Sequence, residues 1–339
     1  MNEYFNDLLN QGMTVRPGRM EDLPSAVAMF NRSSQKIIGR DEFSLERYQH
    51  EWNHPNFDLD LSTRVVLSPQ GDVIGCIEVW DTNPNPIHPW VWARVDPAWE
   101  GKGIGTAMMR WAIDRAHQAI EQVPAEARVS IYCGANRAND AAQQLFADLG
   151  LSAIRYSWTM LIAFDQEPPE PQWPEGIELR TYHHPDQARD VYDVIRNAFR
   201  DHWGYIEVPF EDGFERWQHF ALAEEMYFDP DLWFLAMDGD KIAGISLCAP
   251  RTDDDPDRGW VNTLGVLKPY RRRGVALALL QHSFDAFYRM GKQRAGLGVD
   301  GQNLTGATRL YEKAGMHIEL QEDTYELELR PGEELSNRG

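Results

Sequence analysis

The amino-acid sequence predicts an α/β fold with a mixed α+β sheet, present as two tandem copies. The chain has 339 residues, and at ~100–200 residues per domain this length favours two domains over one. Segments with the same strand, helix and turn patterns also recur in the same order in both halves, as in an internal repeat. The hydrophobic content of 42% is sufficient for a buried core in each copy.

Each copy is predicted to begin with a short strand that ends in an arginine and leads into an amphipathic helix. These segments are MTVRPGRMEDLPSAVAMF at 13–30 and IELRTYHHPDQARDVYDVI at 177–195. A β-hairpin is predicted next, because an Asp-Gly or Gly-Asp turn precedes an apolar strand. The two hairpins are SPQGDVIGCIEV at 68–79 and AMDGDKIAGISL at 236–247.

Two further pairs of segments complete the repeat. A strand, a glycine-containing loop and a helix are predicted at 95–109 and again at 266–280, and a final helix at 139–151 and again at 304–316. Between the copies, FDQEPPEPQWPEG has four prolines and no periodicity, which is typical of an exposed linker. The predicted organisation is a first domain at 1–163, a linker at 164–176, a second domain at 177–330 and a tail at 331–339.

Composition excludes several classes of protein. The formal net charge of −20 argues against nucleic acid as a partner, because phosphate neutralisation needs clustered Lys and Arg. No secretory signal and no run of 18 apolar residues is present, so no membrane association is expected. The odd number of widely spaced cysteines, Cys76, Cys133 and Cys248, predicts neither a disulfide framework nor a metal site. A cytoplasmic monomer or homodimer is expected.

The loop Tyr270–Ala276 is the strongest candidate for a binding site. It follows the strand-like segment 260–267 and opens a helix whose apolar residues have helical spacing. Backbone N–H groups at a helix N-terminus favour an anion, and Gly274 permits close approach of a ligand. Three arginines in the loop add positive charge to an acidic chain. A solvated basic loop that only caps the helix is the alternative.

The corresponding loop of the first half is Glu100–Thr106, with the sequence EGKGIGT. A glycine-rich run alone is a weak signal, because nucleoside-triphosphate and dinucleotide sites also contain one. The loop has no GKS or GKT ending, which argues against a P-loop, and no clear acidic ribose ligand follows, which weakens a dinucleotide-binding interpretation.

At these residues the sequence resembles the GNAT superfamily of acyl-CoA-dependent N-acetyltransferases. Arg271-x-x-Gly274-x-Ala276 is similar to the pyrophosphate-binding Q/R-x-x-G-x-G/A signature of that superfamily. The segment Asn303-x3-Ala307-x2-Leu310-Tyr311-Glu312-Lys313-x-Gly315 is similar to its second signature. The resemblance covers almost the whole chain as two copies, and the tandem layout is also similar to that of mycothiol synthases.

The resemblance implies acetyl-CoA as co-substrate, no metal, and a set of binding residues in the second half. The backbone amides of the 272–276 loop would hold the CoA pyrophosphate, and the strand that ends at Val266 would pair with the pantetheine arm and polarise the thioester carbonyl. Gly265 fits a strand bulge there, although an ordinary kink is the alternative. Asn303 would contact CoA or act only as a helix N-cap. The implied residues are Leu264, Val266, Arg271, Arg272, Arg273, Gly274, Val275, Ala276 and Asn303.

Tyr311 is the predicted catalytic residue. In the superfamily, the matching tyrosine donates a proton to the departing thiolate, and a phenol with a pKa near ~10 is a suitable donor. Without the flanking motif, Tyr311 would be interpreted as a core aromatic residue at helical spacing. The identity of the general base stays open, because the strand before the cradle has no carboxylate. The base would be a water relayed by Asn262, or one of the loop residues His202, Glu207, Glu211, Asp212 and His219.

The first copy is predicted to be degenerate. Glu100 stands at the arginine position and would repel pyrophosphate, and Phe146 stands at the tyrosine position and has no proton to donate. Asn136 or Asn139 would replace Asn303, and Trp80, Trp90 and Trp92 would line a pocket or belong to the core. The amide cradle nevertheless persists, so CoA binding or a purely structural role is expected. The implied binding residues are Val95, Gly101, Lys102, Gly103, Ile104, Gly105 and Thr106.

The predicted function is acetyl transfer from acetyl-CoA to a primary amine of a small molecule, by direct attack and without a covalent enzyme intermediate. Aromatic residues in 199–230 would select the acceptor. Two alternatives stay open: a non-catalytic acetyl-CoA-binding regulatory module, and a protein or peptide N-acetyltransferase.

Overall fold

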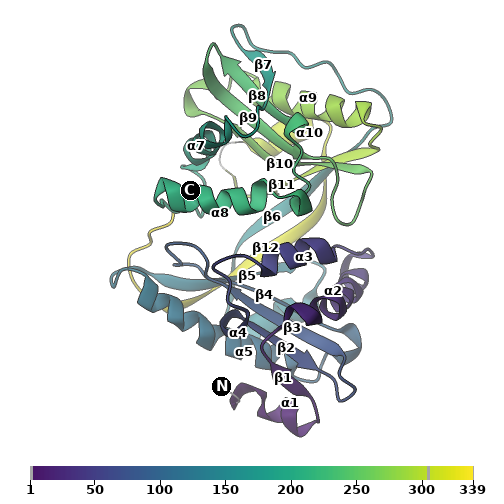
Figure 1. Cartoon of the computed structure of the whole chain (residues 1–339), viewed down its shortest axis with the longest axis vertical. Helices are drawn as coiled ribbons and strands as arrows, with labels where there is room; N and C mark the ends of the chain where they lie inside the picture. Colours follow the sequence, from purple (N-terminus) through teal and green to yellow (C-terminus); the bar gives the residue numbers. More distant parts are fainter. Residues whose placement is uncertain (1–2, 304–305, 339) are drawn as a thin grey trace. The chain divides into compact units, whose positions relative to one another are not determined.

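The computed structural model describes residues 3–303 and 306–338. The chain folds into two compact units (Figure 1). The first unit contains Met1–Arg155 and Glu322–Leu335, and the second contains Tyr156–Gln321 and Ser336–Gly339. Leu304 and Thr305, which the sequence assigns to the start of the last helix, lie outside the described residues.

The first unit is a mixed sheet with helices on both faces. Its strand order is β1-β2-β3-β4-β5-β12, antiparallel except for the parallel pair β4–β5. One face packs on α1, α5 and α6, and the other on α2 and α3. The strands are β1 (Thr14–Arg16), β2 (Thr63–Leu67), β3 (Val73–Trp80), β4 (Trp90–Val95), β5 (Val129–Asn136) and β12 (His317–Arg330). The helices are α1 (Asn6–Asn10), α2 (Leu23–Ile38), α3 (Leu45–Trp52), α4 (Leu59–Ser62), α5 (Ile104–Ala116) and α6 (Asp140–Asp148).

The second unit repeats this plan. Its strand order is β6-β11-β10-β9-β8-β7, with β10–β11 as the parallel pair. One face packs on α9 and α10, and the other on α7 and α8. The strands are β6 (Ser152–Ala163), β7 (Glu178–Thr181), β8 (Trp233–Asp238), β9 (Lys241–Ala249), β10 (Arg258–Val266) and β11 (Arg294–Asp300). The helices are α7 (Ala188–Phe199), α8 (Phe210–Ala221), α9 (Val275–Arg289) and α10 (Ala307–Lys313).

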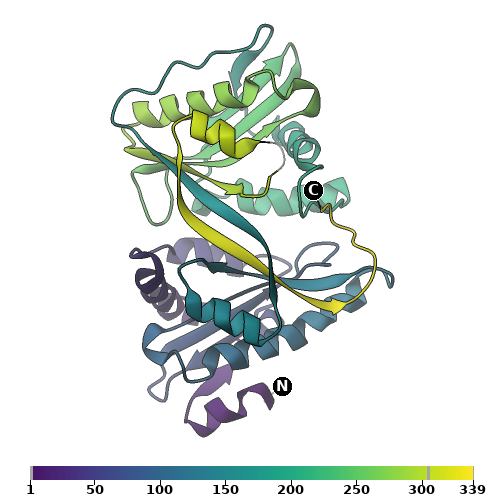
Figure 2. The ribbon, with the colours of Figure 1, turned by 180° about the vertical axis from the view of Figure 1, so that it is seen from behind.

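Each sheet contains one strand from the other half of the sequence. Strand β6 follows α6 in the first half but pairs antiparallel with β11, from Arg294↔Ala163 to Asp300↔Ser157. Strand β12 ends the second half but pairs antiparallel with β5, from Glu322↔Asn136 onward. Figure 2 shows the course of both strands, β6 in teal and β12 in yellow. The compact units therefore differ from the sequence halves by this exchange of strands.

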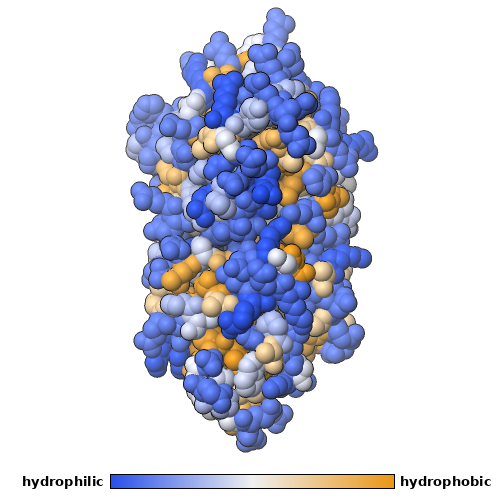
Figure 3. Space-filling view, turned by 90° about the vertical axis from the view of Figure 1, so that its right-hand side faces the viewer, coloured by the Kyte–Doolittle hydropathy of each residue, from blue (hydrophilic) through white to orange (hydrophobic). Residues whose placement is uncertain are grey.

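The central strands are apolar because both faces of each sheet are covered. In β3 every residue except the last is buried, and strands covered on both faces show such continuous apolar runs. The predicted hairpins occur as β2–β3 and β8–β9, and Gly71 and Gly239 in their turns have φ of 93° and 59°. The surface in the view of Figure 3 is mainly hydrophilic with smaller apolar patches. No helix within the described ranges is long and apolar enough to span a membrane.

A buried carboxylate, Glu78 on β3, lies between two indoles in the first unit. Trp52 and Trp80 each donate an indole N–H to one carboxylate oxygen at 2.7 Å, and Glu78 is 2% exposed. Burial raises its pKa from 4.5 to about 7, although both indole hydrogen bonds oppose the rise. The protonated carboxyl is therefore favoured in the folded state.

This pKa predicts a pH-dependent stability of the first unit. When the pKa of a carboxyl is higher in the folded than in the unfolded state, its protonation stabilises the fold. This stabilisation is complete at a pH below the unfolded-state pKa and is lost as the pH rises through the folded-state pKa. The free energy of unfolding should therefore fall by about 3 kcal/mol between about pH 4.5 and about pH 8 because of Glu78 alone. Urea unfolding followed by tryptophan fluorescence should show a flatter pH slope for Glu78→Gln than for the wild type. Equal slopes would contradict the assignment.

Candidate active site

In the second unit, the two parallel strands pair over only part of their length, and the stretch between them without pairing is termed the slot. Strands β10 and β11 pair only from Arg258↔Arg294 to Val261↔Leu297, although β10 continues to Val266 and β11 to Asp300. The register of β10 against β9 shifts between Val261 and Thr263, so a bulge lies at the point where β10 leaves β11. Backbone groups of β10 beyond this point are available to a ligand that enters the slot.

The bulge is at Asn262, whereas the sequence suggested Gly265. Gly265 pairs regularly with Ile245. A Cβ at Gly265 would lie 3.1 Å from the Phe199 ring and 3.3 Å from the Ala198 side chain, so the glycine permits close packing of the end of α7 on β10. Close approach of another element is the second common reason for a glycine in a strand.

The first unit has a similar slot without the bulge. Strands β4 and β5 pair only at Trp90↔Tyr132 and Val91↔Cys133. The register of β4 against β3 is continuous from Gly75↔Val95 to Trp80↔Trp90. Strand β4 therefore has no counterpart of the bulge that β10 has where it leaves β11.

Both candidate anion cradles have the same backbone conformation. Each starts with a 3-10 turn, Pro97–Trp99 or Lys268–Tyr270. Two residues with positive φ follow in each loop: Gly101 at 74° and Gly103 at 83° in the first unit, Arg272 at 62° and Gly274 at 96° in the second. Helices α5 and α9 begin directly after these glycines.

Each cradle contains backbone amide groups that precede the first helical hydrogen bond. The first helical hydrogen bonds are donated by Ala107 N–H to Gly103 and by Ala278 N–H to Gly274. The preceding N–H groups at each helix mouth are those that a helix leaves for an anion. This arrangement suits a diphosphate in both units.

Arg271 anchors the cradle of the second unit to α7. Its guanidinium donates to both carboxylate oxygens of Asp201, at 2.5 and 3.0 Å, and to the backbone oxygens of Ala198 and Val266 at 2.7 and 3.1 Å. This pairing lowers the pKa of Asp201. Arg271 therefore positions the cradle and leaves the free positive charge to Arg272 and Arg273.

The first unit has the same ion pair with its charges exchanged. Glu100, at the position of Arg271, accepts a hydrogen bond from Lys36 of α2 at 2.5 Å. The negative charge that the sequence predicts to repel pyrophosphate thus has a cationic partner. Lys102 lies over the Trp99 ring, with its Nζ 4.2 Å from the ring centroid.

Tyr311 of α10 is 8% exposed and belongs to the same hydrophobic core as the buried face of α9. Burial raises the pKa of its phenol to about 12, so the hydroxyl is protonated at neutral pH. Phe146 of α6 occupies the corresponding position in the first unit, is 6% exposed, and packs against Tyr325 with ring centroids 5.0 Å apart. The N–H of Asn303 donates to the backbone oxygen of Asp300.

The sequence-derived base candidates differ in their surroundings. Glu207 pairs with Arg196, and Glu211 with Arg189, so both carboxylates are engaged in ion pairs. His202 is half-buried, and burial lowers its pKa. Its imidazole lies within electrostatic reach of Asp201, Arg271 and Asp300, that is, near both the cradle and the end of β11.

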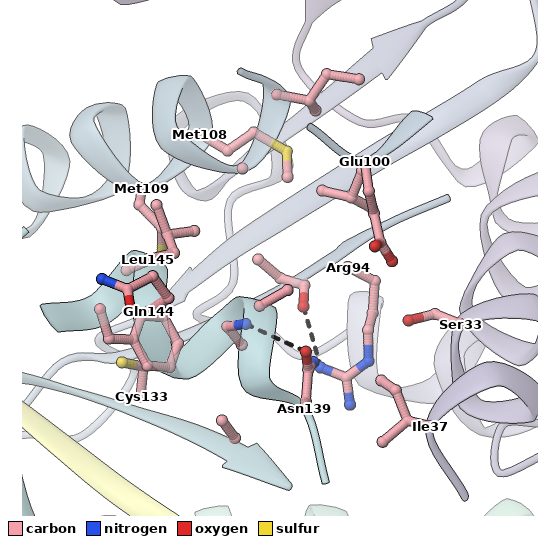
Figure 4. A pocket seen from close by; sticks show the side chains of 18 of the residues that line it. Ser33, Ile37, Arg94, Glu100, Met108, Met109, Cys133, Asn139, Gln144 and Leu145 are labelled. Carbon is pink, nitrogen blue, oxygen red and sulfur yellow. Dashed lines mark hydrogen bonds between the residues drawn. The ribbon is translucent and has the colours of Figure 1, made fainter. Parts of the chain in front are cut away.

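A cavity of about 540 Å³ occupies the slot of the first unit, a size typical of small-ligand sites. Figure 4 shows it with Met108 and Leu145 on one side and Ser33 and Ile37 of α2 on the other. Its lining includes the sequence-predicted residues Val95, Gly101, Gly103, Ile104, Gly105, Thr106, Asn136, Asn139 and Phe146.

Six polar residues in this lining were missed by sequence reasoning: Ser33, Glu42, Arg94, Gln144, Asp148 and Glu322. Of these residues, only Arg94 could have been found from the sequence. Side chains alternate between the two faces of a strand, which places Arg94 on the same face of β4 as Trp92. Trp80 and Trp92 pack in the aromatic core, where Trp80 stacks on Phe57 with ring centroids 3.7 Å apart. The described residues contain no cluster of metal-ligating side chains.

Comparisons with known proteins agree with this geometry. A model of the acetyltransferase (GNAT) family matches residues 30–151 and 189–316. Mycothiol acetyltransferase of Nocardia farcinica is 30% identical over 235 residues, 67% of this chain and 72% of the relative. The enzyme of the same name from Thermobispora bispora is 28% identical over 256 residues, 74% of this chain and 79% of the relative.

Solved structures show the same tandem arrangement. A GCN5-related N-acetyltransferase from Sphaerobacter thermophilus superposes with a TM-score of 0.79 and 30% identity, over 95% of this chain and 98% of that one. A tandem GNAT protein from the clavulanic acid biosynthesis pathway superposes with a TM-score of 0.70 and 15% identity, over 95% of this chain and 100% of that one. The second likeness concerns the fold alone.

Proposed function

Because this chain belongs to the GNAT family of acetyltransferases, we propose that its second unit transfers the acetyl group of acetyl-CoA to a primary amine of a small molecule. The relatives named mycothiol acetyltransferases support a small-molecule acceptor. The observation that carries the proposal is the combination of an amide cradle, a slot opened by a bulge and a buried tyrosine within one unit.

The second unit fits acetyl-CoA through its backbone. Amides at Gly274, Val275 and Ala276 would bind the diphosphate, with Arg272 and Arg273 adding exposed positive charge. The pantetheine arm would pair with β10 between Leu264 and Val266, where β11 no longer occupies the strand edge. A backbone N–H on this segment would then stabilise negative charge on the thioester oxygen.

Direct transfer needs one proton acceptor and one proton donor. The amine nitrogen attacks the thioester carbon, the new C–N bond forms, and the C–S bond breaks with its electron pair remaining on sulfur. Tyr311 gives its phenolic proton to this thiolate. The amine loses a proton to a base, for which His202 is a reasonable candidate because its lowered pKa keeps the imidazole neutral.

For the first unit we propose CoA binding without transfer. Its cradle has the backbone conformation of the second, and its slot contains an open cavity. Phe146 has no proton for the leaving thiolate, and β4 has no bulge. Lys36 compensates Glu100 at the cradle.

A thiol-release assay on the full chain tests the function. With acetyl-CoA and a panel of small primary amines, free thiol should form only when an amine is present. Tight CoA binding without turnover for any amine would indicate a regulatory module instead. Release that requires a peptide amine would indicate protein acetylation.

A further inference from the structure

We propose that the cavity of the first unit binds a small zwitterion of the amino-acid class between Arg94, Glu42 and Glu322. This site is separate from the acetyl transfer assigned to the second unit.

Arg94 on β4 lies beside two aromatic rings and is incompletely hydrogen-bonded. Its guanidinium lies over the Trp92 ring, 4.7 Å from the centroid, and over the Phe43 ring at 5.7 Å. One terminal nitrogen donates to the Ala93 oxygen at 3.0 Å. The Nε atom is buried and has no hydrogen-bond partner among the described residues. A buried donor without a partner is unfavourable, so a ligand that accepts a hydrogen bond from it would be favoured.

Two carboxylates line the same cavity as this guanidinium, Glu42 and Glu322. Glu322 is within electrostatic reach of both Glu42 and Arg94. Within residues 3–303 and 306–338, however, no carboxylate oxygen lies within 4.0 Å of the guanidinium nitrogens of Arg94. Opposite charges thus face a common cavity without closing an ion pair.

A ligand with a carboxylate and an ammonium group complements this arrangement. Its carboxylate would accept hydrogen bonds from Arg94, and its ammonium would donate to Glu42 or Glu322. Glu42 is held in place by the Ser34 hydroxyl, which donates to one of its oxygens at 2.6 Å. Ile37 and Ile38 supply an apolar wall for a side chain. Figure 4 shows the Arg94 side chain extending beside Asn139 towards Ile37.

The second unit lacks this site. Gly265 occupies the position of Arg94, and Phe199 and Ala198 fill the space that a side chain would need. The arginine is therefore a property of the first unit and not of the repeated fold.

Calorimetric titration of the full chain tests the proposal, with glycine, L-leucine and L-phenylalanine as probes and no CoA present. At least one amino acid should bind saturably, and the methyl ester and the N-acetyl derivative of the best binder should each bind about tenfold more weakly or worse. Arg94→Gln and Glu322→Gln should weaken binding to the same degree, and circular dichroism would check that both variants fold. Arg137→Gln is the matched control, because Arg137 is 67% exposed and pairs with Asp323 in the same unit.

No saturable binding of any of the three amino acids would overturn the proposal. Equal binding of the free amino acid, its methyl ester and its N-acetyl derivative would also overturn it. Wild-type binding by both folded variants would do the same and would leave Arg94 as a structural support for Trp92 and Phe43. Loss of acetyl transfer through Tyr311→Phe should leave amino-acid binding intact, so a failure of the transferase proposal is distinguishable from a failure of this one.

Discussion

A Tyr311→Phe variant should turn over about 100-fold more slowly or worse, while the KM for acetyl-CoA changes little. The substitution removes only the hydroxyl, and phenylalanine retains the packing of the ring at this 8% exposed position. Burial raises the pKa of the phenol to about 12, so the hydroxyl retains its proton over the range in which a transferase is assayed. Without this proton, the departing thiolate keeps its negative charge.

Steady-state kinetics with acetyl-CoA and the best amine would measure this effect. Tyr288→Phe is the matched control, because Tyr288 lies in the same unit on α9 and is 36% exposed. A turnover number for Tyr311→Phe equal to that of the control would remove Tyr311 from the mechanism and leave it as a core residue.

A Gly274→Val variant should raise the KM for acetyl-CoA about tenfold to a hundredfold. Gly274 has φ of 96°, a conformation that costs a β-branched residue about 1–3 kcal/mol. A Cβ there would meet only Pro174, at 3.9 Å, so the effect arises from the backbone. The amides at the mouth of α9 must turn when φ changes.

Gly291→Val is the matched control, because it introduces a similar backbone strain at a position outside the cradle. Gly291 has φ of 79° at the end of α9, and no heavy atom lies within 4 Å of a Cβ placed there. It should lower the stability of the protein with little change in the KM for acetyl-CoA. An equal rise in the KM of both variants would mean that general destabilisation, and not the cradle, weakens binding.

The repeated fold and the glycines before α5 and α9 were predictable because their signals are local, and anion binding at these glycines stays a prediction. Gly103 and Gly274 precede helices with apolar periodicity, and a positive φ at such a position favours glycine. The family signatures around Gly274 and Tyr311 lie within short segments of the sequence.

The strand exchange was not predictable, because pairing is not local. β6 and β12 each follow a helix in their own half, yet each pairs with a strand of the other half. Gly265 shows a related ambiguity: glycine in a strand indicates a bulge or a close approach, and only the distant contact with Phe199 decides between them.

Long-range ion pairs were also beyond sequence reasoning. The guanidinium of Arg271 bonds to Asp201, which is far away in the sequence, and a contact of Arg271 with pyrophosphate stays a prediction. Glu100 suggested repulsion, but Lys36 neutralises it. In each case the role depends on the end of a helix that packs against the cradle.

The division of labour between the two units depends on which helix mouth holds the diphosphate of the reacting acetyl-CoA. The most direct test compares Gly274→Val with Gly103→Val in parallel acetyl-CoA titrations of amine-dependent thiol release. Gly274→Val should raise the KM for acetyl-CoA, and Gly103→Val, with the same backbone conformation in the first unit, should leave the KM within about twofold of wild type. The reverse result, a raised KM for Gly103→Val alone, would place the reaction in the first unit and contradict the account.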